Sequence, residues 1–171
     1  MLNEMNDAKK SRMSDQDYNS KVILQMTDII SENPEDYKAY VMRGNHYLDA
    51  GKLIESISDL TKAIQLDPSD PMVFNNRGVA YRRSVDKEKA LEDFAKALTI
   101  KPNYREAYNN RGMVLADNYE YEAAILEFTK AIEIDSDYWY AYNNRAMSRW
   151  ALGNREGAES DYKIVSKYMS G

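Results

Sequence analysis

The sequence predicts an all-α array of stacked helix pairs. A pentapeptide recurs at intervals of 34 residues, as FNNRG at 74–78, YNNRG at 108–112 and YNNRA at 142–146, and a looser copy, YVMRG, stands at 40–44. Within each period, apolar residues follow the spacing of two amphipathic helices. A fixed period of this size is typical of repeat proteins, in which small units stack against one another.

The first unit, 37–70, illustrates the expected elements in order. Its first half carries apolar and small residues at helical spacing, and Gly51 marks the end of that helix. Its second half carries the stripe of a second amphipathic helix, which Pro68 ends. Asp70 and Pro71 then open the next unit as N-cap and first-turn proline.

Five repeat columns of aromatic, small or bulky residues keep the same register in all four units. Small residues allow two helices to approach closely, and bulky residues fill the space between them. In unit order, the small column of the first helix is Gly44, Gly78, Gly112 and Ala146. The bulky column of the second helix is Leu60, Phe94, Phe128 and Tyr162.

This period and these columns resemble the tetratricopeptide repeat (TPR) family, over residues 37–171. The resemblance implies a right-handed α-solenoid of four TPR helix pairs, namely 37–70, 71–104, 105–138 and 139–171. The chain departs from the family where serine replaces a usual proline at Ser136 and Ser170, and where arginine replaces a usual leucine once in each unit. Neither departure changes the predicted fold.

The two ends of the array carry their own patterns. An apolar stripe from Val22 to Ile30 predicts an N-terminal capping helix over 16–33, and we expect residues 1–15 to be a disordered tail. In the last unit, Glu159 and Ser166 occupy two columns that are apolar in the earlier units, so we expect that unit to be terminal, with a polar outer face.

The arginine column has a matching column of carboxylates sixteen residues later. We expect each pair to join the two helices of one unit as a structural ion pair, with two parallel hydrogen bonds. The predicted pairs are Arg43 with Asp59, Arg77 with Asp93, Arg111 with Glu127, and Arg145 with Asp161.

Asparagines in the middle of the first helices need an explanation, because asparagine is a poor helix-interior residue. If the family arrangement holds, first helices line a concave face, and one hypothesis is that the carboxamides hold the backbone of an extended peptide. Asn76, Asn110 and Asn144 resemble the asparagine ladder of some TPR proteins. The alternative is that the asparagines cap or cross-link neighbouring first helices. The candidate groove residues are Asn45, Asn75, Asn76, Arg82, Asn109, Asn110, Met113, Asn143, Asn144, Met147 and Trp150.

Apolar groups must supplement any amide ladder. Three to six hydrogen bonds at roughly 0.5–1.5 kcal/mol each, less ordering costs, fall short of the about −8 kcal/mol of a micromolar complex. Met113 and Met147 suit a tolerant groove, and Trp150 either sharpens a pocket or covers the end of the stack. TPR proteins that clamp chaperone tails use basic residues where this chain has Val41, Glu106 and Asn110, which argues against that ligand.

Composition excludes several classes of function. The chain has no cysteine and one histidine, so we expect no disulfide, metal site or cofactor. We find no phosphate-binding loop and no nucleophile–base set, so we expect no catalytic residues and no enzyme. The net charge of −5 argues against nucleic acid and anionic membrane, and no apolar run approaches the roughly 18 residues of a membrane span. We expect a cytoplasmic protein.

The sequence therefore predicts a non-enzymatic scaffold that holds an extended segment of a protein or peptide partner in its concave groove. Two alternatives stay open. Identical copies could pack through their ends or grooves into a structural homo-oligomer, or the chain could be a regulatory fragment of a larger protein. The identity of the partner does not follow from the sequence.

Overall fold

The computed structural model describes residues 14–169, and within that range every regular element is an α-helix. No helix among the described residues is both long enough and apolar enough to cross a membrane. The helices are α2 (Asp15–Glu32), α3 (Tyr37–Asp49), α4 (Leu53–Leu66), α5 (Pro71–Arg83), α6 (Lys87–Ile100), α7 (Arg105–Asp117), α8 (Tyr121–Ile134), α9 (Trp139–Ala151) and α10 (Arg155–Met169).

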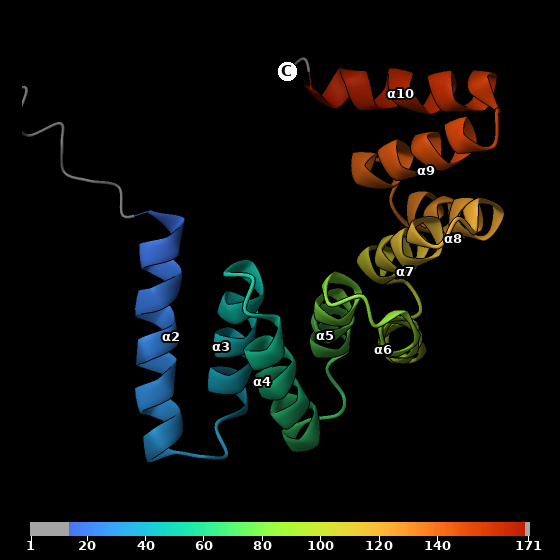
Figure 1. Cartoon of the computed structure of the whole chain (residues 1–171). Helices are drawn as coiled ribbons and strands as arrows, with labels where there is room; N and C mark the ends of the chain where they lie inside the picture. Colours follow the sequence, from blue (N-terminus) through green and yellow to red (C-terminus); the bar gives the residue numbers. More distant parts are fainter. Residues whose placement is uncertain (1–13, 170–171) are drawn as a thin grey trace, which may run out of the picture.

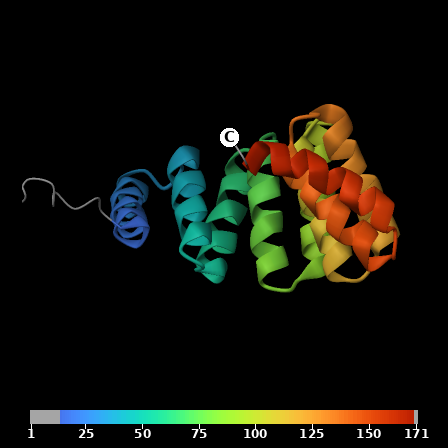
Figure 2. The same ribbon diagram turned by 90° about the horizontal axis from the view of Figure 1, so that it is seen from above.

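The predicted all-α solenoid is confirmed, and each expected unit holds one helix pair. The pairs follow one another along an arc, with the first helix of each pair on the inner side (Figure 1). A view from above shows the same succession from α2 at one end to α9 and α10 at the other (Figure 2). The inner side is therefore built from α3, α5, α7 and α9.

Local sequence sets the helix boundaries. Asp36, Asp70 and Asp86 accept backbone N–H bonds as N-caps of α3, α5 and α6. At the N-terminus, Ser14 caps α2, so that helix begins one residue before the expected start at 16. The rest of the expected tail, residues 1–13, lies outside the described residues, as do residues 170–171.

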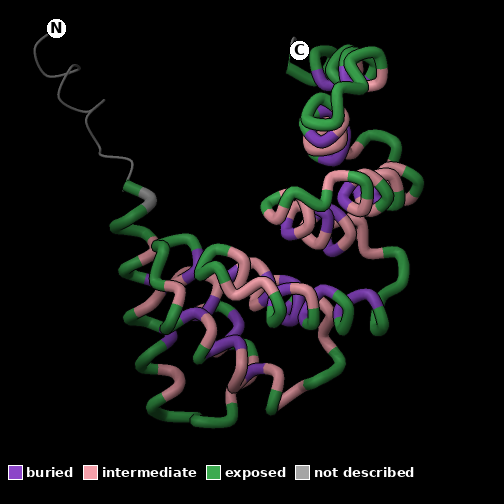
Figure 3. The backbone as a smooth tube through the Cα atoms, turned by 45° about the vertical axis from the view of Figure 1, so that its right-hand side comes forward, coloured by how far each residue is buried: buried purple, intermediate pink, exposed green. Residues whose placement is uncertain are grey.

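The core runs continuously from unit to unit. One cluster joins Val41, Leu60 and Val73 from three successive helices, and another joins Phe74, Leu98 and Ala107 from the next three. Buried residues accordingly follow the lines where helices meet, while exposed residues cover the outside (Figure 3). Since each unit completes the core of its neighbour, the pairs are stable as an array and not singly.

The small column lets the two helices of a pair approach closely. A Cβ atom added at Gly78 would lie 2.8 Å from the Phe94 ring, and one at Gly112 would lie 2.6 Å from the Phe128 ring. Both rings are buried. In the fourth unit Ala146 takes the place of the glycine, and the opposing bulky residue, Tyr162, is 37% exposed.

Each column arginine forms a two-pronged bond with its carboxylate. The Nε and Nη2 atoms of Arg77 donate to Asp93 at 2.8 Å each, and those of Arg43 donate to Asp59 at 2.7 and 2.8 Å. The same geometry joins Arg111 to Glu127 and Arg145 to Asp161. Every pair links the first helix of its unit to the second.

The same arginines also reach back to the preceding helix pair. The Nη1 atom of Arg77 donates to Thr61 Oγ1 at 3.0 Å, and Arg145 makes the equivalent bond to Thr129. Arg43 bonds in this way to Thr27 of α2. The corresponding residue for Arg111 is Ala95, which has no hydroxyl. The ion pair is thus a junction between units as well as within them.

Helix α2 occupies the position of a second helix that precedes the first full unit. Val22 and Met26 pack on Ala39 of α3, and His46 Nδ1 lies 2.7 Å from Asn19 Oδ1. The ring of Tyr18 meets the His46 ring edge-on. The only histidine of the chain therefore packs α2 onto the array.

Removal of Arg77 should destabilise the protein in a pH-dependent way. Burial already raises the pKa of Asp93, and the two bonds from Arg77 oppose that rise. In Arg77→Ala the pKa of Asp93 in the folded protein rises further above its value in the unfolded chain. The loss of unfolding free energy is therefore complete above the pKa of Asp93 in the folded variant, and it disappears below the pKa of Asp93 in the unfolded chain. We expect a loss of about 3 kcal/mol at pH 7 and a clearly smaller loss near pH 4, measured by urea denaturation.

Two other variants calibrate this result. Arg111→Ala should lose less than Arg77→Ala, because the Glu127 side chain is 18% exposed and that of Asp93 is 6% exposed. Lys130→Ala removes a solvent-exposed pair with Glu133 and should leave the unfolding free energy unchanged within experimental error. Equal losses for all three variants would show that burial of the pair does not matter.

Removal of the Ser56 hydroxyl should stabilise the protein. The Oγ atom of Ser56 is buried and has no hydrogen-bond partner among the described residues. Ala90, Ala124 and Ala158 fill the same repeat position and are also fully buried. We expect Ser56→Ala to raise the unfolding free energy by about 1 kcal/mol in a denaturant titration, whereas a loss would reveal a bond that the hydroxyl makes.

Candidate functional site

The inner side of the arc carries two hollows, one toward each end. The first lies between α3 and α5 and has a volume of about 360 Å3. The second lies between α7 and α9 and has a volume of about 290 Å3. Each contains two methionines on neighbouring first helices, namely Met42 and Met72 in one and Met113 and Met147 in the other.

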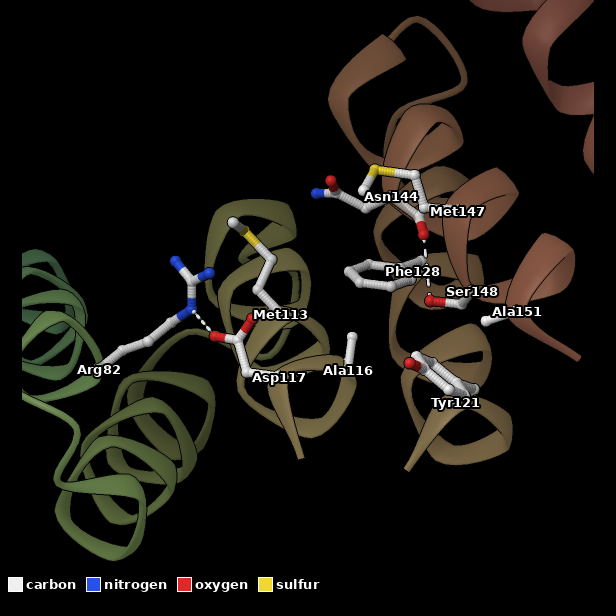
Figure 4. A pocket seen from close by; sticks show the side chains of 10 residues that line it. All are labelled: Arg82, Met113, Ala116, Asp117, Tyr121, Phe128, Asn144, Met147, Ser148 and Ala151. Carbon is white, nitrogen blue, oxygen red and sulfur yellow. Dashed lines mark hydrogen bonds and ion pairs between the residues drawn. The ribbon is translucent and has the colours of Figure 1, made fainter. Parts of the chain in front are cut away.

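The C-terminal hollow has an apolar floor and polar edges. Arg82 and Asp117 form an ion pair on one side, while Asn144 and Met147 stand on the other (Figure 4). Met147 is 58% exposed, so its thioether is open to a ligand. The complete lining is Arg82, Met113, Ala116, Asp117, Tyr121, Phe128, Asn144, Met147, Ser148 and Ala151.

The N-terminal hollow is built from other repeat positions, nearer the starts of α3 and α5. Met42 and Met72 are 46% and 43% exposed. The Tyr37 hydroxyl donates to Asp70 Oδ2 at 2.5 Å, and burial followed by this bond raises the pKa of Tyr37. Tyr37 is therefore a neutral donor at neutral pH and fixes the Asp70 carboxylate at the edge. The other lining residues are Lys38, Val41, Asn45 and His46.

The asparagines between the hollows form a chain of amide bonds across three units. Asn110 Nδ2 donates to Asn75 Oδ1 at 3.0 Å, and Asn75 Nδ2 donates to Asn76 Oδ1 at 3.2 Å. Asn76 Nδ2 in turn donates to Asn45 Oδ1 at 2.9 Å. The chain runs from α7 through α5 to α3, so these amides cross-link neighbouring first helices.

A second link joins the last two units. Asn144 Nδ2 donates to Asn109 Oδ1 at 2.9 Å, and Asn109 contacts the Met113 thioether. Asn75 and Asn109 are only 6% and 4% exposed, so they offer little surface to a ligand. By contrast, the Oδ1 atoms of Asn110 and Asn144 have no bonding partner among the described residues, and both side chains are only half-buried.

The two arginines at the end of α5 are also used between units. Arg82 Nε donates to Asp117 Oδ2 of α7 at 2.7 Å, and Arg83 Nη1 donates to the Leu48 carbonyl of α3 at 2.9 Å. Both residues thus tie α5 to its neighbours. An acidic ligand would have to compete with Asp117 for Arg82.

The remaining predicted residues lie outside the two hollows. Trp150 is 53% exposed and lies beside the Arg155 guanidinium, and it lines neither hollow. Asn143 is half-buried, and its amide contacts the Met147 thioether at 3.8 Å. Trp150 therefore belongs to the end of the array more than to the hollow beside Met147.

Sequence analysis missed two contributors from second helices. Tyr121 and Phe128 of α8 line the C-terminal hollow, although we expected only first helices there. Phe128 had been assigned wholly to the packing column. A repeat pattern indicates that such a residue is buried between helices, but it does not indicate that the residue also forms the floor of a hollow. No group of three or more potential metal ligands occurs among the residues that the structure describes.

The amide chain predicts different effects for two asparagines of the same column. Asn75→Ala removes one donated and one accepted bond, so we expect a loss of about 1–2 kcal/mol in unfolding free energy. Asn143→Ala removes only the weak contact to sulfur and should change stability by at most about 0.5 kcal/mol. Both substitutions change helix propensity by the same amount, so thermal and urea melts of the two variants isolate the effect of the amide bonds. Equal effects on stability would contradict the cross-link.

Known families and structures match the repeat region. Family models described as TPR repeat and tetratricopeptide repeat match residues 44–84, 71–104 and 106–138, which together exceed half of the chain. A search of curated proteins found no match.

Several solved structures share the fold. A crystal structure of MamA superposes with a TM-score of 0.78 at 22% identity, covering 86% of each chain. YrrB, described as a TPR protein with an unusual peptide-binding site, gives 0.68 at 20% identity over 86% of this chain and 76% of its own. The first TPR of Spaghetti (RPAP3), bound to an HSP90 peptide, gives 0.65 at 27% identity over 68% and 93%. With the repeats matched by sequence and the solenoid matched by structure, the chain belongs to the tetratricopeptide repeat family.

Proposed function

We propose that this protein is a protein-interaction scaffold that holds an extended, mainly apolar segment of a partner protein along its inner face. The observation that carries this proposal is the pair of methionine-lined hollows on that face. Methionine is flexible and polarisable, so it adapts to apolar side chains of different shape. The half-buried amides of Asn110 and Asn144 lie on the same face and leave free acceptors for backbone N–H groups of the segment.

The spacing of the hollows gives the segment a pattern. Across the stack the hollows are two steps between adjacent first helices apart, each about 8–10 Å, so they are separated by at least about 16–20 Å. An extended chain rises about 3.3 Å per residue, so about five or six residues span that distance. We therefore expect two bulky apolar residues, such as Leu, Met or Phe, separated by about that interval.

The charge of the hollows favours a neutral segment over an acidic one. Lys38 and Arg82 are balanced by Asp70 and Asp117 among the residues that line them. The related RPAP3 domain is described with the bound HSP90 peptide SRMEEVD, which carries three carboxylate side chains. Such a tail would meet Glu106, Asp117 and Asp70 here without a surplus of cations. The family of this chain and the peptide-binding structures that resemble it support a scaffold. The side chains that line its hollows favour a neutral segment over the acidic HSP90 peptide.

Selection from random dodecapeptides displayed on phage tests this proposal. Enriched peptides should carry two bulky apolar residues about five or six residues apart, and synthetic copies should bind with micromolar affinity in fluorescence anisotropy. Met113→Asp/Met147→Asp places charges in the C-terminal hollow and should weaken binding at least about tenfold, because burial of one such side chain contributes about 1.5–3 kcal/mol.

Leu126→Asp is the matched control. Leu126 is 68% exposed on α8 and lines neither hollow, so this variant should bind within about twofold of the wild type. Methionine variants avoid the difficulty of asparagine variants, which also disturb the links between units. The proposal fails if no peptide is enriched, or if the methionine variant binds the selected peptides as well as the control does.

A further inference from the structure

One bond between successive helix pairs is missing at a single place in the array. The column arginines of α3, α5 and α9 each donate from Nη1 to a threonine of the preceding second helix, at 3.0 Å in all three cases. The equivalent residue for Arg111 of α7 is Ala95 of α6. The Nη1 atom of Arg111 has no bonding partner among the described residues. The junction between α6 and α7 therefore lacks a tie that the other junctions have.

Two further observations show that this junction is loosely packed on its outer side. The Arg111 and Glu127 side chains are 26% and 18% exposed, more than those of the other three arginine–carboxylate pairs. Where a second helix meets the first helix of the next unit, α6 and α7 make the least extensive contact of any such pair in the described part of the chain. Because each unit of a repeat array is held mainly by its neighbours, motion concentrates at the weakest junction.

The same junction is firmly tied on its inner side and beside the turns. One amide bond and two ion pairs join the second unit to the third there, namely Asn110 with Asn75, Arg82 with Asp117, and Lys87 with Glu120. The missing threonine bond lies on the side of the second helices, away from these ties. Two bodies that are joined along one edge and loosely packed along the other can rock about the joined edge.

We propose that the α6–α7 junction is a hinge, at which the first two units rock against the last two about the links between α5 and α7. Helices α2–α6 form one body and α7–α10 form the other, and the two follow each other along the arc (Figure 1). Within each body the arginine–threonine bonds are complete. Ala95 permits the motion, because a threonine at this position would bind Arg111 and hold the outer side closed.

The hinge lies between the two hollows of the inner face. The N-terminal hollow lies between α3 and α5 in the first body, and the C-terminal hollow lies between α7 and α9 in the second. The walls of each hollow come from one body, except that Arg82 reaches the C-terminal hollow through its ion pair at the hinge. Rocking therefore changes the distance between the hollows and leaves each hollow intact.

This motion sets which partner segments fit, a consequence that rests on the proposed function, whereas the hinge itself does not. A segment that places one apolar residue in each hollow must match the distance between them. Because that distance varies at the hinge, the inner face accepts segments whose two apolar residues are separated by more than one interval. Ala95 is thus a specificity-determining residue, although it lines neither hollow.

Distances between spin labels test the hinge in the protein without ligand. The chain has no cysteine, so introduced cysteines carry the labels at chosen positions. One exposed repeat column runs along α2, α4, α6, α8 and α10, namely Leu24, Ser58, Glu92, Leu126 and Ser160. In double electron–electron resonance we expect a broad distance distribution for Ser58→Cys/Leu126→Cys, which spans the hinge. Leu24→Cys/Glu92→Cys spans two junctions that have the threonine bond, and it should give a narrow distribution.

Two reciprocal substitutions are the matched variants. Ala95→Thr supplies the missing hydroxyl to Arg111 and should narrow the distribution across the hinge to the width of the control pair. Thr61→Ala removes the hydroxyl that Arg77 uses and should broaden the distribution of the control pair. A distribution across the hinge that is as narrow as that of the control pair overturns the inference, and so does a control pair that Thr61→Ala leaves unchanged. These two results decide the question even if Ala95→Thr fails to fold.

A series of peptides separates the role of the hinge in binding from the proposed function. Each peptide carries two leucines, and the interval between them varies across the series. The wild type should bind peptides of several intervals within about threefold of one another, whereas Ala95→Thr should favour one interval by about tenfold. If no peptide binds, the proposed function fails and the label distances still decide the hinge. If both proteins accept the same range of intervals, the role of Ala95 in specificity is refuted.

Discussion

The arginine–carboxylate fork is the interaction on which the rest of the structure depends. Each guanidinium binds the second helix of its own unit through two bonds, and three of the four also bind a threonine of the preceding helix pair. Two helices and their neighbour are therefore fixed by one planar group. A leucine at that position would fill the space but would not set the rotation of three helices. Buried ion pairs add little net stability in general, and this one acts through geometry.

The first helices are fixed in turn by their asparagines. Carboxamides bond from α7 to α5 to α3, and again from α9 to α7, so the inner face is a braced surface. Each of these links uses one of the two N–H donors of its amide. The groups left on this face are the remaining amide atoms and four adaptable methionines, which form a surface suited to shape and apolar contact. A rigid frame with soft contact groups loses little entropy on binding while tolerating varied segments.

The outer turns follow a different logic from the inner face. The small column and the buried rings favour stability at each position, whereas Val85 and Tyr119 are strained and exposed. Ser56 is a further departure, with a buried hydroxyl that nothing satisfies among the described residues. Neither the strained turns at Val85 and Tyr119 nor the buried hydroxyl of Ser56 has an explanation in the structure.

The sequence by itself determined the helix pairs, their order, and which columns pack. Gly78 and Phe94, or Arg77 and Asp93, recur at fixed spacing because every unit solves the same packing problem, and repetition makes that solution visible. Tertiary structure decided what one unit does to the next. The threonine bonds of the arginines, the asparagine cross-links, the pairing of Arg82 with Asp117 and the place of Phe128 in a hollow all lie between units. Such contacts depend on the curvature of the stack, which the relative rotation of adjacent pairs sets and which no single repeat encodes.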